Sequence, residues 1–464
     1  MNTESAQAYQ NILDEMRLVY LHDQRPWMIG FSGGKDSTLL CQLVFEMLQT
    51  LQPFERTKKV YIVTSDTGVE NPIIRSYMHR MSAAINEASE AQRLHVEAHI
   101  IYPDPRQSFW SMVIGRGYPT PEPPGFRWCT ERLKIAPSNK FTYETIQKNG
   151  EIVILLGVRK AESVSRAKAI TSREIEGKIL SPHPSIPQAY VYRPLSDIKN
   201  ENVWEYLLRG DGKSAWGTDN HYLFNLYQGE PMGEEQSVVG EVDKDRIPVT
   251  GHSRFGCWCC TMVKEDKSLK NFIDHGAKEL RPLRDFRDWL VSIRDNPDAR
   301  DKKRRNGTVY LMPDGTYGLG PFTMEKRQEI PSRLLALEEE TGFELISLDE
   351  LKEIDRLWDL EGDLSRRALV DLYYQAKGKR LPWDAVKRAK YSEEELSLIR
   401  RLADRYDVPF DLMSQLMTTV DNTKFFTRSS VTIKEVERLI NQGWLHFEYI
   451  RGELPGENQP DRRL

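Results

Sequence analysis

A short segment rich in glycine and hydroxyl side chains, FSGGKDST, occupies residues Phe31 to Thr38. It lies between an apolar run of strand length, WMIGFS, and a stretch with the apolar spacing of a helix. A turn from a strand into a helix directs free N–H groups and the positive end of the helix dipole at an anion. We therefore expect a phosphate site built from Ser32, Gly33, Gly34, Lys35, Ser37 and Thr38.

This loop is not a Walker A motif, because Asp36 follows Lys35 where that motif has serine or threonine. Transfer of a γ-phosphate is therefore not the expected chemistry. The alternative is a tight turn that binds nothing. It is disfavoured because the next strand also ends in a polar turn, Asp66-Thr67-Gly68, and both turns should lie at the carboxyl edge of one parallel sheet, where ligands bind.

Four of the five cysteines are candidates for a single group. Cys257 and Cys260 form a C-x-x-C pair with Cys259 inside it, and Cys129 lies in PGFRWCTERLKIAP. Such thiolates can hold zinc or an iron–sulfur cluster. A structural zinc site usually has a second pair of ligands, so a cluster is favoured, with Cys259 as fourth ligand or persulfide carrier. Catalytic thiols without metal and a zinc site are the alternatives, and Cys41 should be a small buried side chain on a helix.

Elements that alternate along the first half should position these residues. Strands are expected at 27–32, 59–66, 94–102 and 151–159, with helices at 4–21, after residue 38 and from Pro72. This order predicts an α/β fold with a parallel sheet and helices on both faces. We expect one domain over residues 1–265 and a mainly helical region over 266–464, with a β-hairpin near 308–320 that turns at Pro313-Asp314-Gly315.

The composition of the 464 residues, 39% hydrophobic and 29% charged, is that of a globular protein. No apolar run is long enough for a membrane span, no secretory signal is evident, and so few cysteines suggest the reducing cytoplasm. The formal net charge of −4 leaves nucleic-acid binding to a local patch. Lys302, Lys303, Arg304 and Arg305 form the densest candidate patch, and a solvated loop is the alternative.

The segment SGGKDS resembles the PP-loop of the adenine nucleotide α-hydrolase-like ATP pyrophosphatases. The resemblance implies that ATP is split between its α and β phosphates, with Ser32 to Ser37 binding pyrophosphate and Mg²⁺. SDTGVENP and GVRKAESVSR resemble the phosphosulfate reductase branch, which places Asp66, Thr67, Gly157, Arg159, Glu162, Ser163 and Arg166 at the same edge. Arg159 and Arg166, seven positions apart, would lie along one helix face as a phosphate clamp. A surface ion-pair network is the alternative for them.

Three further segments, RWCTERLKIAP, LLGVRKAESVSRA and RFGCWCCTMVKEDKSL, are together similar to the DndC family of DNA phosphorothioation sulfurtransferases, over about the first 270 residues. The resemblance implies a PAPS reductase-like enzyme that adenylates a DNA phosphate oxygen and replaces it with sulfur. It implies ATP, Mg²⁺ and a 4Fe–4S cluster as cofactors. The implied partners are DNA, a cysteine desulfurase and other Dnd proteins. The extra thiol of Cys259 departs from that family's pattern.

This resemblance assigns catalytic roles to Lys35, Asp36, Arg159 and Arg166. Three other functions compete with it. A phosphosulfate reductase needs a cysteine near the C-terminus, and no cysteine follows Cys260. A tRNA thiolase would use the same two chemistries on an RNA base. A nucleotide-binding regulatory subunit without turnover would need no cluster, so intact Lys35, Asp36 and the cysteines argue against it.

Overall fold

The structure is a computed structural model that describes residues 3–123, 125–227, 256–305, 308–309, 311–312, 315–423 and 429–450, the last nine of these by backbone alone. Its contacts divide the chain into two compact units. The first contains residues 1–109 and 121–287, and the second contains residues 110–120 and 288–464. The chain therefore enters the second unit twice, whereas the sequence pattern indicates a single boundary at 265/266, which stays a prediction.

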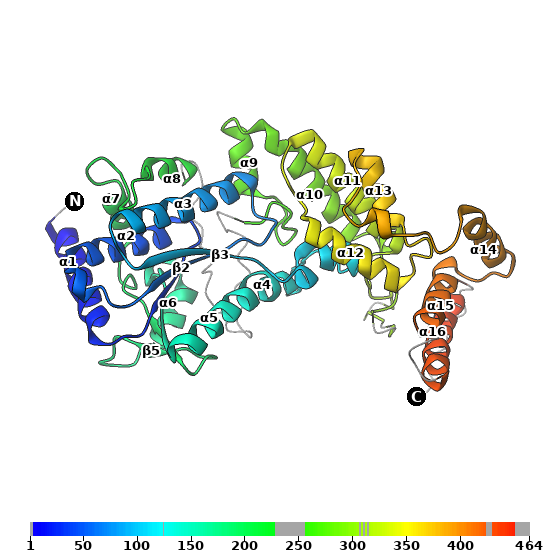
Figure 1. Cartoon of the computed structure of the whole chain (residues 1–464), viewed down its shortest axis with the longest axis horizontal. Coiled ribbons are helices and arrows are strands. Elements are labelled where there is room, and N and C mark those ends of the chain that lie inside the picture. The colour runs from blue at the N-terminus through cyan, green and yellow to red at the C-terminus, as the bar shows by residue number, and fades with distance from the viewer. Residues whose placement is uncertain are drawn as a thin grey trace. The chain divides into compact units, whose positions relative to one another are not determined.

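The first unit is built on a six-stranded sheet in the order β3-β2-β1-β4-β6-β5. Figure 1 shows β2 and β3 of this sheet among the helices of the unit. Neighbouring strands are parallel except β5 and β6, which are antiparallel. The strands are β1 Trp27–Gly30, β2 Val60–Ser65, β3 Val96–Ile101, β4 Ile152–Leu155, β5 Ser181–Pro182 and β6 Ala189–Tyr192. The four strands expected from the sequence are all present.

Helices cover both faces of this sheet because successive strand side chains point to opposite sides. Trp27 and Ile29 of β1 are buried in a core with α1, α2, α3, α7 and α8. Met28 between them is buried in the opposite core, against α5 and α6. The helices of this unit are α1 Thr3–His22, α2 Lys35–Thr50, α3 Pro72–Ala91, α4 Trp128–Thr130, α5 Ala136–Asn149, α6 Val164–Thr171, α7 Asn200–Leu207, α8 Asn220–Tyr227 and α9 Lys267–Asp274. The predicted α/β class is confirmed.

The order of the strands determines where a ligand site is expected in this sheet. The chain runs outward from β1 to β2 and β3, then returns to β4 on the other side of β1. The carboxyl ends of β1 and β4 therefore form the switch point at which open α/β sheets bind ligands. The FSGGKDST loop follows β1, and Gly157 and Arg159 follow β4.

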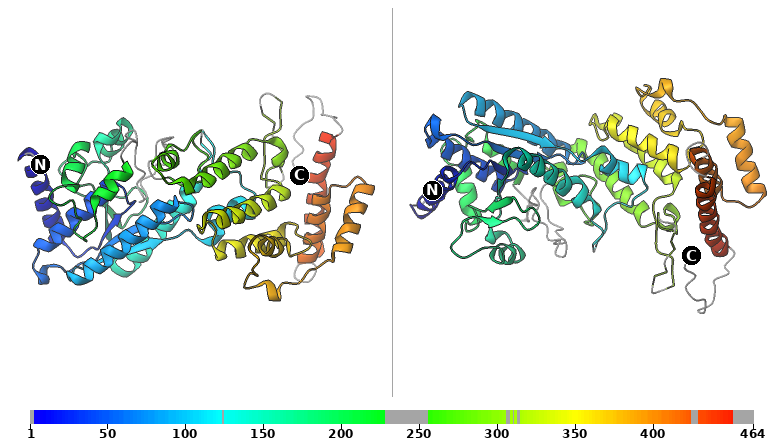
Figure 2. Two further views of the ribbon diagram at one scale, coloured as in Figure 1. Left: turned by 90° about the horizontal axis from the view of Figure 1, so that it is seen from above. Right: turned by 60° about the horizontal axis from the view of Figure 1, so that its bottom comes forward.

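In its described residues the second unit consists of helices joined by loops, with a few short bridges (Figure 2). Its helices are α11 Met324–Thr341, α12 Leu348–Glu361, α13 Ala368–Lys377, α14 Glu393–Arg405, α15 Phe410–Thr423 and α16 Ser429–Ile450, and α10 Arg281–Arg294 crosses the unit boundary. An antiparallel bridge joins Leu311 to Tyr317 within the segment where the sequence predicts a hairpin. Its turn residues Pro313 and Asp314 lie outside the described residues. None of the helices in the described ranges has the length and apolar character needed to cross a bilayer.

The segment 110–120 is held in this second unit by buried polar contacts. The Trp358 indole donates to the carbonyl of Ile114 at 3.0 Å, and the Arg327 Nε donates to the same carbonyl at 2.9 Å. Arg327 is also paired with Glu361 at 2.9 Å. Because these groups are buried, each backbone carbonyl they cap would otherwise lose a hydrogen bond.

Candidate functional site at the carboxyl edge of the sheet

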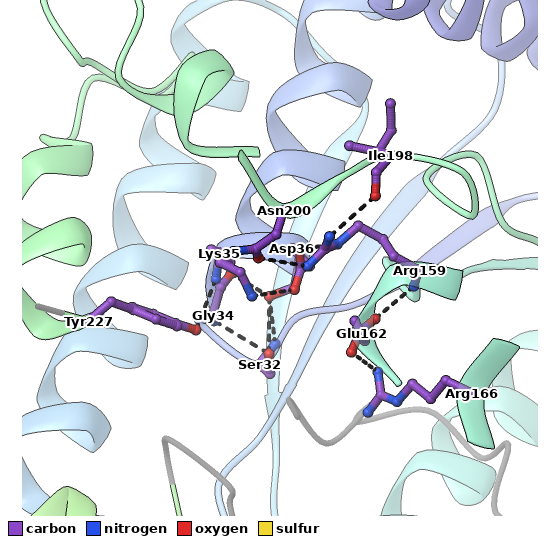
Figure 3. A network of polar contacts seen from close by, with 11 residues as sticks. Ser32, Gly34, Lys35, Asp36, Arg159, Glu162, Arg166, Ile198, Asn200 and Tyr227 are labelled. Carbon is purple, nitrogen blue, oxygen red and sulfur yellow. Dashed lines mark hydrogen bonds and ion pairs between the residues drawn. The ribbon is translucent and has the colours of Figure 1, made fainter. Parts of the chain in front are cut away.

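The glycine loop closes through hydrogen bonds among its own groups (Figure 3). The Ser37 hydroxyl donates to the Gly34 carbonyl at 3.0 Å and lies 3.1 Å from the Ser32 hydroxyl. The Gly34 amide donates to Ser32 Oγ at 3.4 Å. Gly33 has a φ of +76°, and a Cβ there would come within 3.2 Å of Met78 Cγ. The loop is therefore compact, and it needs glycine at residue 33.

Asp36 is the centre of a buried charge cluster. Its Oδ1 accepts from Arg159 Nε at 2.6 Å, and its Oδ2 accepts from Lys35 Nζ at 2.8 Å. The side chains of Lys35, Asp36 and Arg159 are 4%, 2% and 2% exposed. One carboxylate between two cations leaves a net positive charge in a site closed to water, which favours a bound anion.

Arg159 ties the ends of three segments together. Its Nη1 donates to the carbonyl of Ile198 at 3.2 Å, and its Nη2 donates to Asn200 Oδ1 at 3.2 Å. Lys199 is the N-cap of α7, and Asn200 is the first residue of that helix. The Asn200 side chain holds Arg159.

The expectation that Arg159 and Arg166 share one helix face is wrong. Arg159 has extended backbone before the 3₁₀ turn Lys160–Glu162, and only Arg166 lies in α6. Glu162 links them, since its carboxylate accepts from the Arg159 amide at 2.7 Å and pairs with the Arg166 guanidinium. Burial raises the pKa of Glu162, and Arg166 opposes this shift. Ser163 caps α6 by accepting from the Arg166 amide at 3.1 Å.

Gly157 allows the turn after β4 to pass close to the first turn of α2. A Cβ at Gly157 would lie 2.9 Å from the Asp36 carbonyl oxygen and 3.1 Å from its carbon. Only a residue without a side chain fits between these two backbones. The sequence assigned Gly157 to the nucleotide site, and its position beside Asp36 puts it at the same edge.

The buried hydroxyl of Thr38 further supports a phosphate site in this loop. Thr38 is 1% exposed, and its hydroxyl has no hydrogen-bond partner in the described part of the chain. A buried polar group without a partner is uncommon, and a position in a ligand site is one physical reason for it. Together with the excess positive charge, it fits a site that receives an additional acceptor.

The two candidate residues in the turn after β2, Asp66 and Thr67, have different partners. Asp66 is fully buried and accepts from Arg75 Nε at 2.7 Å, His79 Nε2 at 3.0 Å and the Gly68 amide at 2.9 Å. Burial alone raises the pKa of Asp66, but the bonds from Arg75 and His79 outweigh it and hold the pKa below its usual value. Asp66 is thus engaged with α3, while Thr67 faces the cysteines.

Four cysteines gather beside this turn. An antiparallel bridge joins Cys257 to Glu70, and Thr67 Oγ1 lies 3.7 Å from Cys257 Sγ. The Cys260 amide donates to the Cys257 carbonyl at 3.0 Å, which closes the C-x-x-C turn. Buried Cys259 interacts electrostatically with the other three, Cys257, Cys260 and Cys129. Cys257, Cys259 and Cys260 therefore share one turn near Thr67, Cys129 is close enough to interact with them electrostatically, and Cys41 is buried in α2.

Burial raises the pKa of every thiol in this group, that of Cys129 to about 11. Without a metal these thiols are protonated, and binding a metal would release their protons. Within the described ranges no three His, Cys, Asp or Glu side chains are placed to hold a single metal ion. A cluster of several irons is larger than one ion, and its thiolates need not converge on one point. Four thiolates are a donor set that both zinc and an iron–sulfur cluster accept.

Two charged side chains beside the cysteines were missed in the sequence. Lys134 Nζ lies 3.6 Å from Glu70 Oε1, and the Thr67 hydroxyl donates to Glu70 Oε1 at 3.0 Å. Burial by itself lowers the pKa of Lys134, but Glu70, Cys257 and Cys129 outweigh it and raise that pKa. The only signal for them was position: Glu70 lies two residues after Gly68, and Lys134 lies five after Cys129.

The basic run of the second unit is partly engaged. The Arg305 guanidinium pairs with Glu361 at 2.6 Å and donates to the Arg116 carbonyl. Arg305 therefore helps to hold the segment 110–120 rather than extending freely into solvent. Of the four residues proposed to contact DNA, Arg305 has this structural role, and Lys302, Lys303 and Arg304 stay as predicted contacts.

Comparison with known families agrees with this edge of the sheet. Residues 26–263 match the phosphoadenosine phosphosulfate reductase domain, so the chain belongs to that family. The match begins just before β1 and ends just after Cys260, so it includes both the glycine loop and all four grouped cysteines.

Individual relatives are more distant. An uncharacterized protein of Methanocaldococcus jannaschii is 27% identical over 200 residues, which are 43% of this chain and 35% of that protein. The chain thus spans about a third of that relative's length. A phosphoadenylyl-sulfate reductase from Candida auris aligns at 12% identity and a TM-score of 0.30, over 52% of this chain and 98% of that one.

A U34-tRNA thiolase from Methanococcus maripaludis, solved with its 4Fe–4S cluster, aligns at 11% identity and a TM-score of 0.28, over 62% of this chain and 80% of that one. Neither of these two structural alignments bears on the site described above.

Proposed function

We propose that this protein is an ATP-dependent sulfurtransferase that activates a DNA phosphate by adenylation and replaces one of its oxygens with sulfur. The observation that carries the proposal is the contact between Thr67 and Cys257, 3.7 Å apart, which joins the cysteine group to the same sheet edge as the phosphate loop. A site for splitting ATP and a set of sulfur ligands then serve one reaction.

In the first step, a non-bridging oxygen of the DNA phosphodiester attacks the α-phosphorus of ATP. The bond between the α-phosphorus and the bridging oxygen breaks, and pyrophosphate leaves toward the glycine loop. Lys35 and Arg159 would stabilise the negative charge that develops, with Asp36 holding both cations in place. Mg²⁺, carried by the nucleotide, would neutralise the departing phosphates.

In the second step, sulfur at the oxidation level of hydrosulfide forms a bond to the DNA phosphorus. The phosphorus–oxygen bond to the adenylate breaks, AMP leaves with the former DNA oxygen, and the hydrosulfide proton goes to solvent. A cluster held by Cys129, Cys257 and Cys260 would leave one position open for this sulfur, whereas Cys259 as a fourth ligand would close that position. Where a cysteine desulfurase delivers the sulfur as a persulfide, the outer sulfur goes to the phosphorus, and a second thiol forms a disulfide with the cysteine that carried it. A thiol reductant must then reduce this disulfide.

DNA as the acceptor rests on the resemblance to the DndC family and on the basic residues at 302–304. Phosphate contacts from such residues position nucleic acid without reading sequence. Affinity should then fall with salt, with a slope of roughly 0.9 per phosphate neutralised. The Lys302→Ala/Lys303→Ala variant should reduce that slope and leaves the structural Arg305 in place. A slope equal to that of the parent would restrict this unit to protein partners.

The acceptor is tested by reconstitution under anaerobic conditions. The protein is incubated with ATP, a cysteine desulfurase, cysteine, DNA and tRNA, together with the other phosphorothioation proteins. Mass spectrometry of the digested nucleic acids should find phosphorothioate dinucleotides in the DNA. Thiolated nucleosides in the tRNA, with unmodified DNA, would assign the protein to the tRNA thiolases instead.

A further inference from the structure

Tyr227, the last residue of α8, reaches the phosphate loop from outside it. Its hydroxyl accepts a hydrogen bond from the Lys35 amide at 3.2 Å (Figure 3). Its ring lies 5.5 Å from Lys35 Nζ and packs edge-on against Trp204 at 5.2 Å. Tyr227 is 5% exposed, so the contact is made away from water. Nothing in the motif sequences indicated this residue.

The amide that Tyr227 occupies is the first of α2. The first N–H groups of a helix have no partner within the helix, and they are the groups that bind anions. The Lys35 amide is therefore one of the donors expected to hold a phosphate oxygen. The neighbouring donors of the loop also have acceptors within the chain, since Gly34 N–H donates to Ser32 and Lys35 Nζ donates to Asp36. These donors of the loop are thus satisfied by the chain itself.

We propose that Tyr227 is a resting cap on the phosphate site, whose hydroxyl takes the place of a phosphate oxygen and is displaced when the nucleotide binds. The inference rests on the proposed function, because it assumes that this loop binds the β and γ phosphates. One amide proton makes one good hydrogen bond, so the hydroxyl and the phosphate compete for it. A charged phosphate oxygen is the stronger acceptor and wins, but its binding is weakened by the bond that is lost.

The resting cap should weaken the binding only of ligands that place a phosphate in the loop. ATP and pyrophosphate both place phosphates in the loop, so both must displace the hydroxyl. AMP lacks the β and γ phosphates and should bind without displacing it. Removing the hydroxyl should therefore strengthen ATP and pyrophosphate binding by a similar factor, about three- to tenfold from the net contribution of one hydrogen bond.

The test is calorimetric titration of ATP, pyrophosphate and AMP into the full-length parent and Tyr227→Phe proteins. Tyr20→Phe is the matched control, because the Tyr20 hydroxyl is buried and donates to the Lys58 carbonyl at 3.0 Å, away from the loop. We expect about threefold or greater tightening of ATP and pyrophosphate in Tyr227→Phe, with AMP unchanged and Tyr20→Phe equal to the parent for all three ligands.

Unchanged or weaker pyrophosphate binding by Tyr227→Phe would overturn the resting cap, and so would an equal change for AMP, which would indicate a deformed pocket. If Tyr227→Phe unfolds below the parent's melting temperature by more than Tyr20→Phe does, Tyr227→Leu is titrated as the second variant and must give the same tightening. A parent protein that binds neither ATP nor pyrophosphate contradicts the proposed function itself. A parent that binds both, with variants identical to it, contradicts only the cap.

Discussion

Asp36 and Arg159 lie 123 residues apart in the sequence and form a buried ion pair, with 2.6 Å between Oδ1 and Nε. Asp36 lies in the first turn of α2, directly after the loop that follows β1, and Arg159 lies in the turn after β4. The pair therefore closes the switch point of the sheet, and it fixes Lys35 beside the phosphate loop through the second carboxylate oxygen. The site is thus built around the Asp36 carboxylate, whose role is to position two cations, Lys35 and Arg159.

Removal of Arg159 should destabilise the first unit. Arg159→Met leaves the buried Asp36 carboxylate without one of its two cations, and breaking a buried pair costs about 3 kcal/mol. Lys59→Met is the control, because both members of the Lys59–Glu97 pair are exposed, at 55% and 42%, so losing that pair should cost at most about 1 kcal/mol. Urea unfolding followed by fluorescence measures both. Equal losses for the two variants would mean that the Asp36 pair is not central to the unit.

Removal of the Thr67 hydroxyl should reduce sulfur transfer more than ATP cleavage. Thr67→Val keeps the shape of the side chain but loses the contacts with Glu70 and Cys257. Sulfur transfer should fall by roughly tenfold and more steeply than ATP cleavage, because the cysteine side of the site loses its link to the sheet edge. Thr64→Val is the control, since its buried hydroxyl has no partner in the described residues. A parallel loss of both activities in Thr67→Val would place Thr67 at the nucleotide instead.

The cysteine group should hold iron. Anaerobically purified protein is expected to be brown, and serine at Cys129, Cys257 or Cys260 should remove most of its iron and its broad visible absorption. Cys41→Ser should keep both, because Cys41 is buried in α2. Cys259→Ser decides between a ligand, which loses iron, and a persulfide carrier, which keeps iron and loses sulfur transfer. Colourless protein with one zinc per chain would show a structural metal site.

The carboxyl group of Asp359 should make the stability of the second unit depend on pH. Burial raises the pKa of this carboxyl to about 6, with Lys387 opposing the shift and Asp355 and Asp363 adding to it. An acid whose pKa is raised on folding stabilises the folded state less as pH rises from its ordinary 3.8 through 6. Asp359→Asn should therefore gain melting temperature relative to the parent between pH 5 and pH 7.5.

The control for this prediction is Asp349→Asn, which removes an exposed carboxylate from the same helix. Its difference from the parent should change less between the two pH values. Scanning calorimetry at both pH values gives the four differences. An Asp359→Asn protein whose advantage is the same at pH 5 and pH 7.5 would show that the carboxyl is not perturbed by burial.

Much of the sheet edge was predictable because it is encoded locally. The glycines and hydroxyls of the loop, the apolar strands and the helix face of α2 are adjacent in sequence, and each was placed correctly. Which distant side chains meet could not be predicted from such local patterns. Tyr227 and Asn200 contact the site only because α7 and α8 pack on the same face of the sheet as α2.

The error at Arg159 and Arg166 has a related cause. Helical spacing was assumed across Ser163, but this residue has extended backbone and caps the helix that follows. The cap turns the chain between the two arginines. Glu162 therefore joins them through its carboxylate, not through a shared helix face.

The products of ATP cleavage test the central claim most directly. The parent protein, purified without oxygen, is incubated with ATP labelled at the α-phosphate, together with DNA and the sulfur donor system, and the nucleotides are separated by chromatography. Cleavage at the phosphate loop predicts labelled AMP with one pyrophosphate for each AMP, and at least a tenfold loss in Asp36→Ala. Labelled ADP as the main product would contradict an adenylating enzyme and with it the proposed route to the phosphorothioate.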